Sequence, residues 1–162
     1  MSIELHKGDL ARFSADILVN AANSALIPGG GVCGALHRGG GPEIERECTK
    51  HIDKHGSLDP GNAVLTTAGQ LDAEYVCHAV GPVWEDKGTE AKVLRQAYKS
   101  CLDRAAEVGA ESIAFPAIST GIFGYPVKEA AEVALSAVKD AEPDVHFILY
   151  TNEIYNVFRK AL

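Results

Sequence analysis

The segment from residue 20 to residue 37 constrains the fold of this chain more than any other. It reads NAANSALIPGGGVCGALH and joins the apolar run Ile17–Val19 to small and apolar residues typical of a helix start. Its consecutive glycines Gly29, Gly30 and Gly31 allow positive φ angles and a close approach of the backbone to a ligand. Outward-pointing N–H groups in such a loop favour an anion, most often phosphate. The sequence therefore predicts a polar ligand site between a strand and a helix.

Residues 29–34 also match the G-x-G-x-x-G pattern of dinucleotide-binding Rossmann units. That pattern should follow a strand directly, with an acidic residue at a strand end about 20 residues later. Here Ala21–Pro28 intervene, and the region around Lys50–Asp53 has the pattern of a helix. We therefore do not interpret the segment as a Rossmann motif.

A second loop, Ser119–Tyr125, lies between a predicted strand and a predicted helix. It carries two glycines and two hydroxyls at the place where open α/β sheets bind ligands. Taken alone, such a loop is an ordinary strand-to-helix turn. Paired with the first loop, it could hold a pyrophosphate from the other side.

Apolar runs alternate with helix-period segments along the chain, which indicates a layered α/β domain spanning residues 1–162. Helices are predicted over 90–107, ending at Gly109, and over 126–140, with Pro126 in the first turn. Strands are predicted at Ile3–Leu5, Ile17–Asn20, Ala63–Thr67, Tyr75–Val80, Ser112–Phe115 and Val145–Tyr150.

Composition narrows the class of partner. The 162 residues are 46% hydrophobic and carry a formal net charge of −7, without the clustered Lys and Arg that hold nucleic acid. The four cysteines have no C-x-x-C spacing, and neither they nor the histidines form a metal-ligand pattern, so we expect no bound metal. We see no signal peptide or long apolar span, and we expect a reduced, cytoplasmic protein that does not bind membranes.

Five motifs resemble the macrodomain family in their order and spacing. They are GDL at 8–10, NAAN at 20–23, GGGVCGAL at 29–36, HAVGP at 78–82 and ISTGIFGYP at 118–126. The resemblance implies a three-layer α/β/α sandwich with a central mixed sheet of about six strands, without a cofactor and acting as a monomer. MacroD-type and alphavirus macrodomains and Appr-1''-p processing proteins are the similar branches.

The same resemblance implies the ligand and the activity. ADP-ribose and its derivatives, including mono-ADP-ribosylated proteins, are the expected partners. We expect a hydrolase that removes ADP-ribose from acidic side chains or deacetylates O-acetyl-ADP-ribose. The alternatives are a reader module that binds ADP-ribose without turnover and an ADP-ribose 1''-phosphate phosphatase that uses the same pocket.

The resemblance assigns individual residues. Asn23 matches the asparagine that contacts the distal ribose, Asp9 matches the acceptor for the adenine amine, and Phe123 matches the aromatic over the distal ribose. Tyr150 is placed against the adenine, with a core position as the alternative. From the residues alone, Asp9 could instead cap a short helix, and we interpret Asn20 as a turn or capping residue bonded to its own backbone. The predicted binding residues are Asp9, Leu10, Asn23, Gly29, Gly30, Gly31, Val32, Ser119, Thr120, Gly121, Ile122, Phe123, Tyr150 and Asn152.

The catalytic candidates are Asn23, Gly31, His37 and Cys33. Cys33 departs from the MacroD branch, which has an aspartate at this position; the alphavirus branch resembles this chain in having cysteine. A thiol is mostly protonated at neutral pH and is a poor general base, and we do not favour it as a nucleophile. His37 matches a MacroD histidine and could equally be a helix-surface or core residue. We interpret His78 as a hydrogen-bonded strand residue, whereas Trp84 could shield the site or simply pack.

Overall fold

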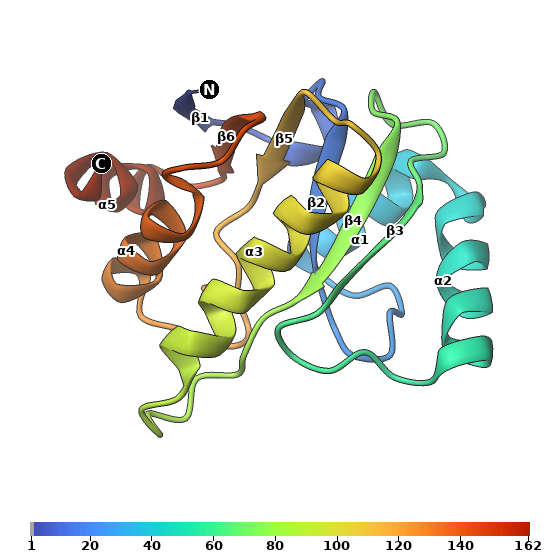
Figure 1. Ribbon diagram of the computed structural model, residues 1–162, viewed down its shortest axis with the longest axis horizontal. Coiled ribbons are helices and arrows are strands. Elements are labelled where there is room, and N and C mark those ends of the chain that lie inside the picture. Colours follow the sequence, from blue (N-terminus) through green and yellow to red (C-terminus); the bar gives the residue numbers. More distant parts are fainter. Residues whose placement is uncertain (1) are drawn as a thin grey trace.

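The chain folds into three layers, with a sheet between two sets of helices (Figure 1). The computed structural model describes residues 2–162. The strands are β1 (Ile3–Lys7), β2 (Ile17–Ala22), β3 (Ala63–Thr67), β4 (Tyr75–Val80), β5 (Ser112–Phe115) and β6 (Asp144–Leu149). The helices are η1 (Leu10–Arg12, a 3₁₀ helix), α1 (Gly31–Gly40), α2 (Pro42–His55), α3 (Glu90–Glu107), α4 (Val127–Val138) and α5 (Asn152–Ala161).

The sheet is mixed and has the strand order β1-β6-β5-β2-β4-β3. Neighbouring strands are parallel except β3 and β4, which pair in antiparallel fashion. Because the five parallel strands point the same way, their carboxyl ends meet at one edge of the sheet. That edge is where open α/β sheets bind their ligands.

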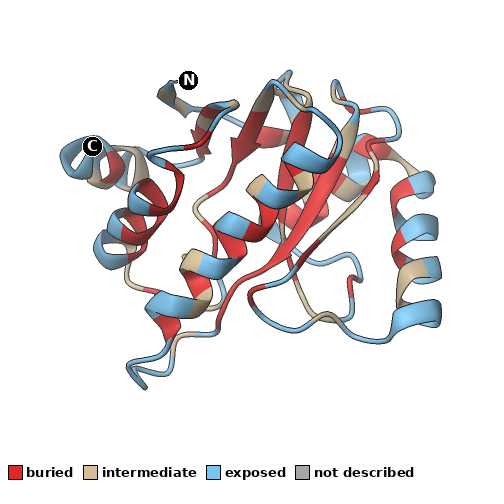
Figure 2. Ribbon diagram, in the orientation of Figure 1, coloured by how far each residue is buried: buried red, intermediate tan, exposed pale blue. Residues whose placement is uncertain are grey.

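Two hydrophobic clusters fill the two faces of the sheet. Odd-numbered strand residues such as Val19 and Phe147 pack under α3, α4 and α5, together with Tyr98. Even-numbered residues such as Leu18 pack under η1, α1 and α2, together with Ile44. Figure 2 shows buried residues running through the strands and along the sheet-facing sides of the helices. This alternation follows from the period of two in a strand, which sends successive side chains to opposite faces.

The expected three-layer fold is confirmed, and so are most strand positions. β3, β4 and β5 have the predicted bounds, whereas β1 and β2 each run two residues further than predicted. β6 ends at Leu149, so the prediction that Tyr150 belongs to the strand is wrong. The Tyr150 side chain is 75% exposed, which also rules out a core position for it.

The helices agree with the prediction less closely than the strands do. α3 has the predicted bounds, and Gly109 follows it with a φ of +65° and an N–H bonded to the Ala106 carbonyl. α4 is shorter than predicted, and Pro126 is its N-cap because its ψ of 130° is extended rather than helical. α5 was not predicted. Its N-cap is Thr151, whose hydroxyl accepts a hydrogen bond from the Ile154 N–H at 3.2 Å.

No helix among residues 2–162 combines the length and the apolar character needed to cross a membrane.

Candidate functional site

A cavity of about 620 Å³ opens at the edge of the sheet where the parallel strands end. Its walls are the segments that directly follow β1, β2, β5 and β6, together with the first turns of α1. Small-molecule sites typically enclose about 300–1,000 Å³, so the cavity suits a nucleotide-sized ligand. Of the predicted binding residues, all except Asn152 line it, and Cys33 lines it as well. His37 does not.

Asn23 lines the cavity and also folds the loop that carries it. Its Nδ2 donates to the Ile27 carbonyl at 2.9 Å, and its Oδ1 accepts from the Ile27 N–H at 3.1 Å. Leu26, between them, has a φ of +54°, a strained value for a residue with a side chain. Backbone strain of this kind persists where the surrounding contacts fix it. The asparagine side chain therefore holds the loop in a single conformation beside the cavity.

The glycine run after this loop opens α1. Only Gly31 of the three glycines has a positive φ, +56°, and a Cβ at Gly29 or Gly30 would meet open space. Gly34 is needed for a different reason, because a Cβ there would overlap the Gly29 carbonyl oxygen. The first N–H groups of a helix have no partner within the helix, so α1 presents amide donors at its cavity end.

The second loop presents amide donors from the opposite wall. The backbone N–H groups of Gly121, Ile122 and Phe123 have no hydrogen-bond partner in the described part of the chain. Their neighbours are tied down: Thr120 N–H bonds to the Ala117 carbonyl, and Tyr125 N–H bonds to the Ser119 carbonyl at 2.9 Å. Consecutive free amides form an anion-binding nest.

The loop after β4 supports this second loop from behind. The Trp84 N–H donates to the Phe123 carbonyl at 2.8 Å, and the Trp84 ring packs on Tyr125 with centroids 4.7 Å apart. Trp84 thus packs rather than shielding the site edge. Ser119 has a φ of +69° and is 5% exposed, and its hydroxyl has no protein partner among residues 2–162. Its side chain lies against Gly81, where a Cβ would come within 2.6 Å of Ile118 Cγ2.

The far end of the cavity is formed by the segments after β1 and β6. Asp9 caps η1, its carboxylate accepting from the Ala11 N–H at 3.0 Å, so the capping role considered from sequence is correct, and Asp9 lines the cavity as well. Tyr150 lines the cavity with most of its surface exposed. Asn152 is the first residue of α5, and Ile154 from that helix lines the cavity in its place.

A buried hydrogen-bond network connects this site to the sheet. The Cys33 thiol donates to the Ile27 carbonyl at 3.6 Å, and Asn20 Nδ2 donates to the Cys33 sulfur at 3.7 Å. The same Asn20 nitrogen lies 2.9 Å from His78 Nδ1, and His78 Nε2 lies 2.9 Å from Thr66 Oγ1. Burial lowers the pKa of His78 to about 3, which keeps it neutral. The prediction of a hydrogen-bonded His78 is confirmed.

The interpretation of Asn20 is wrong. Asn20 is 1% exposed and bonds to side chains of the network, not to its own backbone, because β2 continues past it to Ala22. The local side-chain-to-backbone role belongs to Asn23 instead.

His37 faces this network and not the cavity. Its ring centroid is 6.2 Å from that of His78, and neither of its buried ring nitrogens has a partner in the described part of the chain. Burial lowers the pKa of His37, although Glu45 opposes the shift. Nearby, burial raises the pKa of Cys48 to about 12, so this thiol stays protonated. His37 is therefore a packed residue of α1 and not part of the cavity wall.

Sequence reasoning missed Arg38 and Ile154, which both line the cavity. Arg38 could have been predicted from sequence, because Gly31, Ala35 and Arg38 fall on one face of a helix that begins at Gly31. It is the only basic side chain among the described lining residues. Ile154 could not be found in this way, since the helix that carries it was not predicted.

The fold and the cavity define a class: an α/β/α domain whose site, at the carboxyl edge of a parallel sheet, presents backbone amides from two loops. The Macro domain family model matches residues 19–134, and this chain belongs to the macrodomain family. A macro domain-containing protein of Streptomyces coelicolor is 45% identical over 167 residues, covering 99% of this chain and 98% of that protein. An Enterobacter protein named O-acetyl-ADP-ribose deacetylase is 43% identical, covering 99% and 93% respectively.

Solved structures agree with the fold. The Oceanobacillus iheyensis macrodomain with ADP superposes with a TM-score of 0.94 at 31% identity, covering 98% of this chain and 88% of that one. The Trypanosoma brucei macrodomain in complex with ADP-ribose gives a TM-score of 0.88 at 36% identity, covering 98% of this chain and 68% of that one.

Proposed function

We propose that this chain binds ADP-ribose and hydrolyses its derivatives, releasing ADP-ribose from mono-ADP-ribosylated acidic side chains or acetate from O-acetyl-ADP-ribose. One observation carries the proposal: the partner-free amides of Gly121, Ile122 and Phe123 line the same cavity as the N-terminus of α1. Two sets of amide donors suit a pyrophosphate, which has two adjacent anionic groups. The deacetylase name of the Enterobacter relative and the ADP-ribose in the trypanosome structure support the same ligand.

The two ends of the ligand are held by different chemistry. Asp9 accepts the adenine amine beside the Leu10 backbone, and the Tyr150 ring lies against the adenine face, where aromatic contact is favourable. At the other end, Asn23 orients the distal ribose and Phe123 packs over it. This order follows the lining, since Asp9 and Tyr150 follow β1 and β6, whereas Asn23 follows β2.

Hydrolysis of the ester substrates adds water to the ester carbonyl carbon, with cleavage of its bond to the ribose oxygen, or, for an ester on the anomeric carbon, to that carbon, with cleavage of its bond to the ester oxygen. In either case a carboxylic acid and ADP-ribose leave. Asp9 is the only carboxylate among the described lining residues, and in this binding mode it is occupied at the adenine. The pyrophosphate of the substrate therefore takes the proton of the attacking water, and that proton passes to the departing oxygen. The amide donors, Gly31 N–H among them, stabilise the developing charge.

Cys33 acts in this scheme as a positioning residue. Its thiol proton is directed at the Ile27 carbonyl, which also accepts from Asn23 Nδ2, so the thiol helps to hold the Asn23 loop. His37 takes no direct part, because it lies outside the cavity lining.

A reader that binds ADP-ribose without turnover is the second candidate function. The thiol at position 33 favours the reader, because Asp9 is the only carboxylate among the described lining residues and it follows β1, whereas Asn23 follows β2. Binding is common to both candidates, so only turnover separates them.

The deciding experiment offers three substrates: a glutamate-linked mono-ADP-ribosylated protein, O-acetyl-ADP-ribose and ADP-ribose 1''-phosphate. We expect the wild type to release product from one of the two esters, and Asn23→Ala to lower kcat/KM by about 100-fold through misplacement of the substrate. Asn23→Asp keeps the oxygen that accepts from the Ile27 N–H and removes only the Nδ2 donor, so it tests the contribution of that donor alone. Asn152→Ala, outside the cavity, should match the wild type.

Calorimetry with ADP-ribose is run on every variant. Binding by the wild type without turnover of any substrate would favour the reader, and turnover of the phosphate alone would identify a phosphatase. Failure to bind ADP-ribose at all would overturn the proposed function.

A further inference from the structure

Three metal-ligating side chains gather on one face of the edge pair β1 and β6, outside the cavity. These strands are parallel, and Glu4 lies directly opposite His146 in the register. His6 is two residues further along β1, so its side chain projects from the same face. The two histidines are 140 positions apart in sequence.

The spacing of the three ligand atoms matches one bound cation. His6 Nε2 is 3.0 Å from His146 Nδ1, and His146 Nδ1 is 3.7 Å from Glu4 Oε2. All three atoms lie within 4.8 Å of one another. Ligands of tetrahedral zinc, with Zn–N and Zn–O bonds of about 2.0–2.2 Å, are separated by about 3.3–3.6 Å. The cluster therefore needs only small side-chain movements to close around an ion.

Packing already orients the two imidazoles. The Phe13 ring contacts both, with centroids 5.1 Å from His6 and 5.1 Å from His146. The His146 side chain is 16% exposed and the Glu4 side chain 57% exposed, so the cluster is packed against the protein on one side and open to solvent on the other. An open position leaves room for water as a further ligand.

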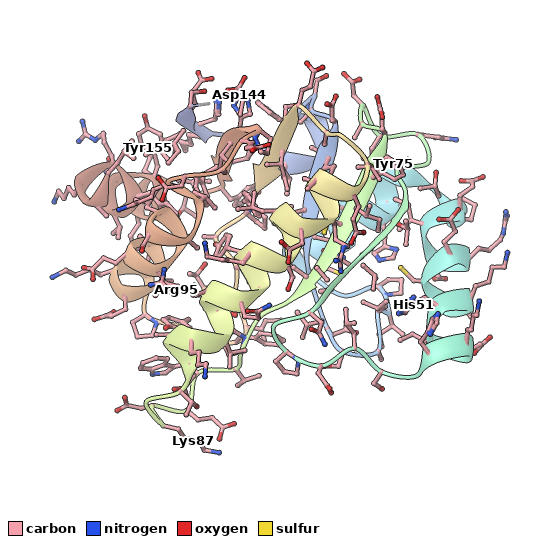
Figure 3. All side chains as sticks on the ribbon, in the orientation of Figure 1. His51, Tyr75, Lys87, Arg95, Asp144 and Tyr155 are labelled. Carbon is pink, nitrogen blue, oxygen red and sulfur yellow. The ribbon has the colours of Figure 1, made fainter. Side chains whose placement is uncertain are left out.

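The charges around the cluster favour a cation. The carboxylates of Glu4 and Asp144 both lie close enough to His146 to interact with its imidazole ring electrostatically. Figure 3 shows Asp144 beside the first strand, at the end of the sheet near the N-terminus.

A second cluster of metal-ligating side chains, formed by His37, Cys48 and His78, is less suited to bind an ion. Both ring nitrogens of His78 are already hydrogen-bonded, to Asn20 and to Thr66. Coordination there would break a buried network, whereas in the edge cluster it displaces only the proton shared by His6 and His146.

We propose that Glu4, His6 and His146 form a binding site for a borderline divalent transition-metal cation, for which Zn²⁺ is the probe. Two imidazoles and one carboxylate are ligands that such ions prefer to the ligands of Ca²⁺ or Mg²⁺. The expectation of no metal rested on spacing along the sequence, which is blind to ligands brought together by strand pairing. The ion joins β1 to β6, the two strands that lead into Asp9 and Tyr150 of the cavity. This proposal does not depend on the proposed function.

The test is calorimetric titration of untagged, chelator-stripped protein with Zn²⁺ alone, together with thermal unfolding in the presence and absence of Zn²⁺. We expect one ion per chain and a rise in Tm, because a ligand that binds only the folded state stabilises it. His146→Ala and His6→Ala should abolish both effects while folding like the metal-free wild type. Glu4→Gln should weaken binding without abolishing it.

The control is the double variant His51→Ala and His55→Ala, which removes the other close histidine pair, with ring centroids 4.7 Å apart on α2. His51 lies on the far side of the molecule from Asp144 (Figure 3), and this variant should bind Zn²⁺ like the wild type. The proposal is overturned if the wild type does not bind Zn²⁺, if His146→Ala still binds it with unchanged affinity, or if the α2 double variant loses binding. If a single-site variant is unfolded, Glu4→Gln and His6→Gln in the folded state decide the question.

Discussion

At the scale of single residues, position 81 requires glycine because a side chain there would collide with its neighbours, and not because of its backbone angles. A Cβ there would overlap the Ser119 hydroxyl and lie 2.6 Å from Ile118 Cγ2, directly behind the second loop. We expect Gly81→Ala to lower the free energy of unfolding by about 1–3 kcal/mol, as other overpacked sites do, and to weaken ADP-ribose binding. Gly121→Ala is the matched control, since its Cβ would meet open space, and its stability should stay within about 0.5 kcal/mol of the wild type. Equal stability of the two variants in urea would contradict this account of Gly81.

His78 makes stability depend on pH. Its pKa is lowered to about 3 in the folded chain, whereas a histidine in the unfolded chain titrates near the ordinary pKa of 6.5. Above pH 6.5 neither state binds the proton, and the stability is fully present. As the pH falls from 6.5 toward 3, only the unfolded chain takes up the proton, so this stability is lost. The loss approaches about 1.4 kcal/mol per pH unit.

Urea unfolding at several pH values between about 7 and 5 checks this dependence. His78→Gln should be less stable at neutral pH and should show a shallower loss on acidification. His55→Gln, at the exposed end of α2, should keep the slope of the wild type. If His78→Gln and the wild type lose stability in parallel, another group is responsible for the slope.

At the scale of elements, α5 depends on a single deep anchor. Phe158 is 0% exposed and packs on Phe147 of β6 with ring centroids 5.2 Å apart. Phe158→Ala should lower the free energy of unfolding by about 3–5 kcal/mol, the usual cost of removing a buried aromatic ring. Because α5 also carries Ile154 into the cavity lining, ADP-ribose affinity should fall as well. Arg159→Ala, at an exposed neighbouring position, should change neither quantity, and a loss below about 1 kcal/mol for Phe158→Ala would argue against the anchor.

At the scale of the whole molecule, the net charge of −7 opposes polyanions, while the cavity presents partner-free backbone amides that suit a small anion. Nucleic-acid binding depends on releasing counterions from clustered Lys and Arg, and it falls steeply with salt. We therefore expect fluorescence anisotropy to detect no complex with single-stranded RNA at low salt. ADP-ribose affinity should change little between low and moderate salt. An RNA complex that competes with ADP-ribose would contradict this expectation.

Some features of this macrodomain could be predicted from sequence because they are local. Glycine runs, turn residues and apolar periodicity encode backbone conformation and burial within a few residues, so β3, β4, β5 and α3 were predicted with their bounds. The two amide-rich loops were found for the same reason. The resemblance of five motifs to one family then suggested the ligand and most of the lining, because each motif contributes at least one residue to the cavity wall.

The rest was decided by tertiary structure. Asn20 and Asn23 look alike in NAAN, but β2 continues to Ala22, which buries Asn20 against His78 and leaves Asn23 to fold its loop. His6 and His146 meet only because β1 pairs with β6, and Ile154 reaches the cavity only because Phe158 anchors α5. The sequence by itself determined the strands, the loops and the family, since short-range conformational preferences carry that information. The meeting of distant side chains depends on strand order and register, and these are set by packing over the whole chain.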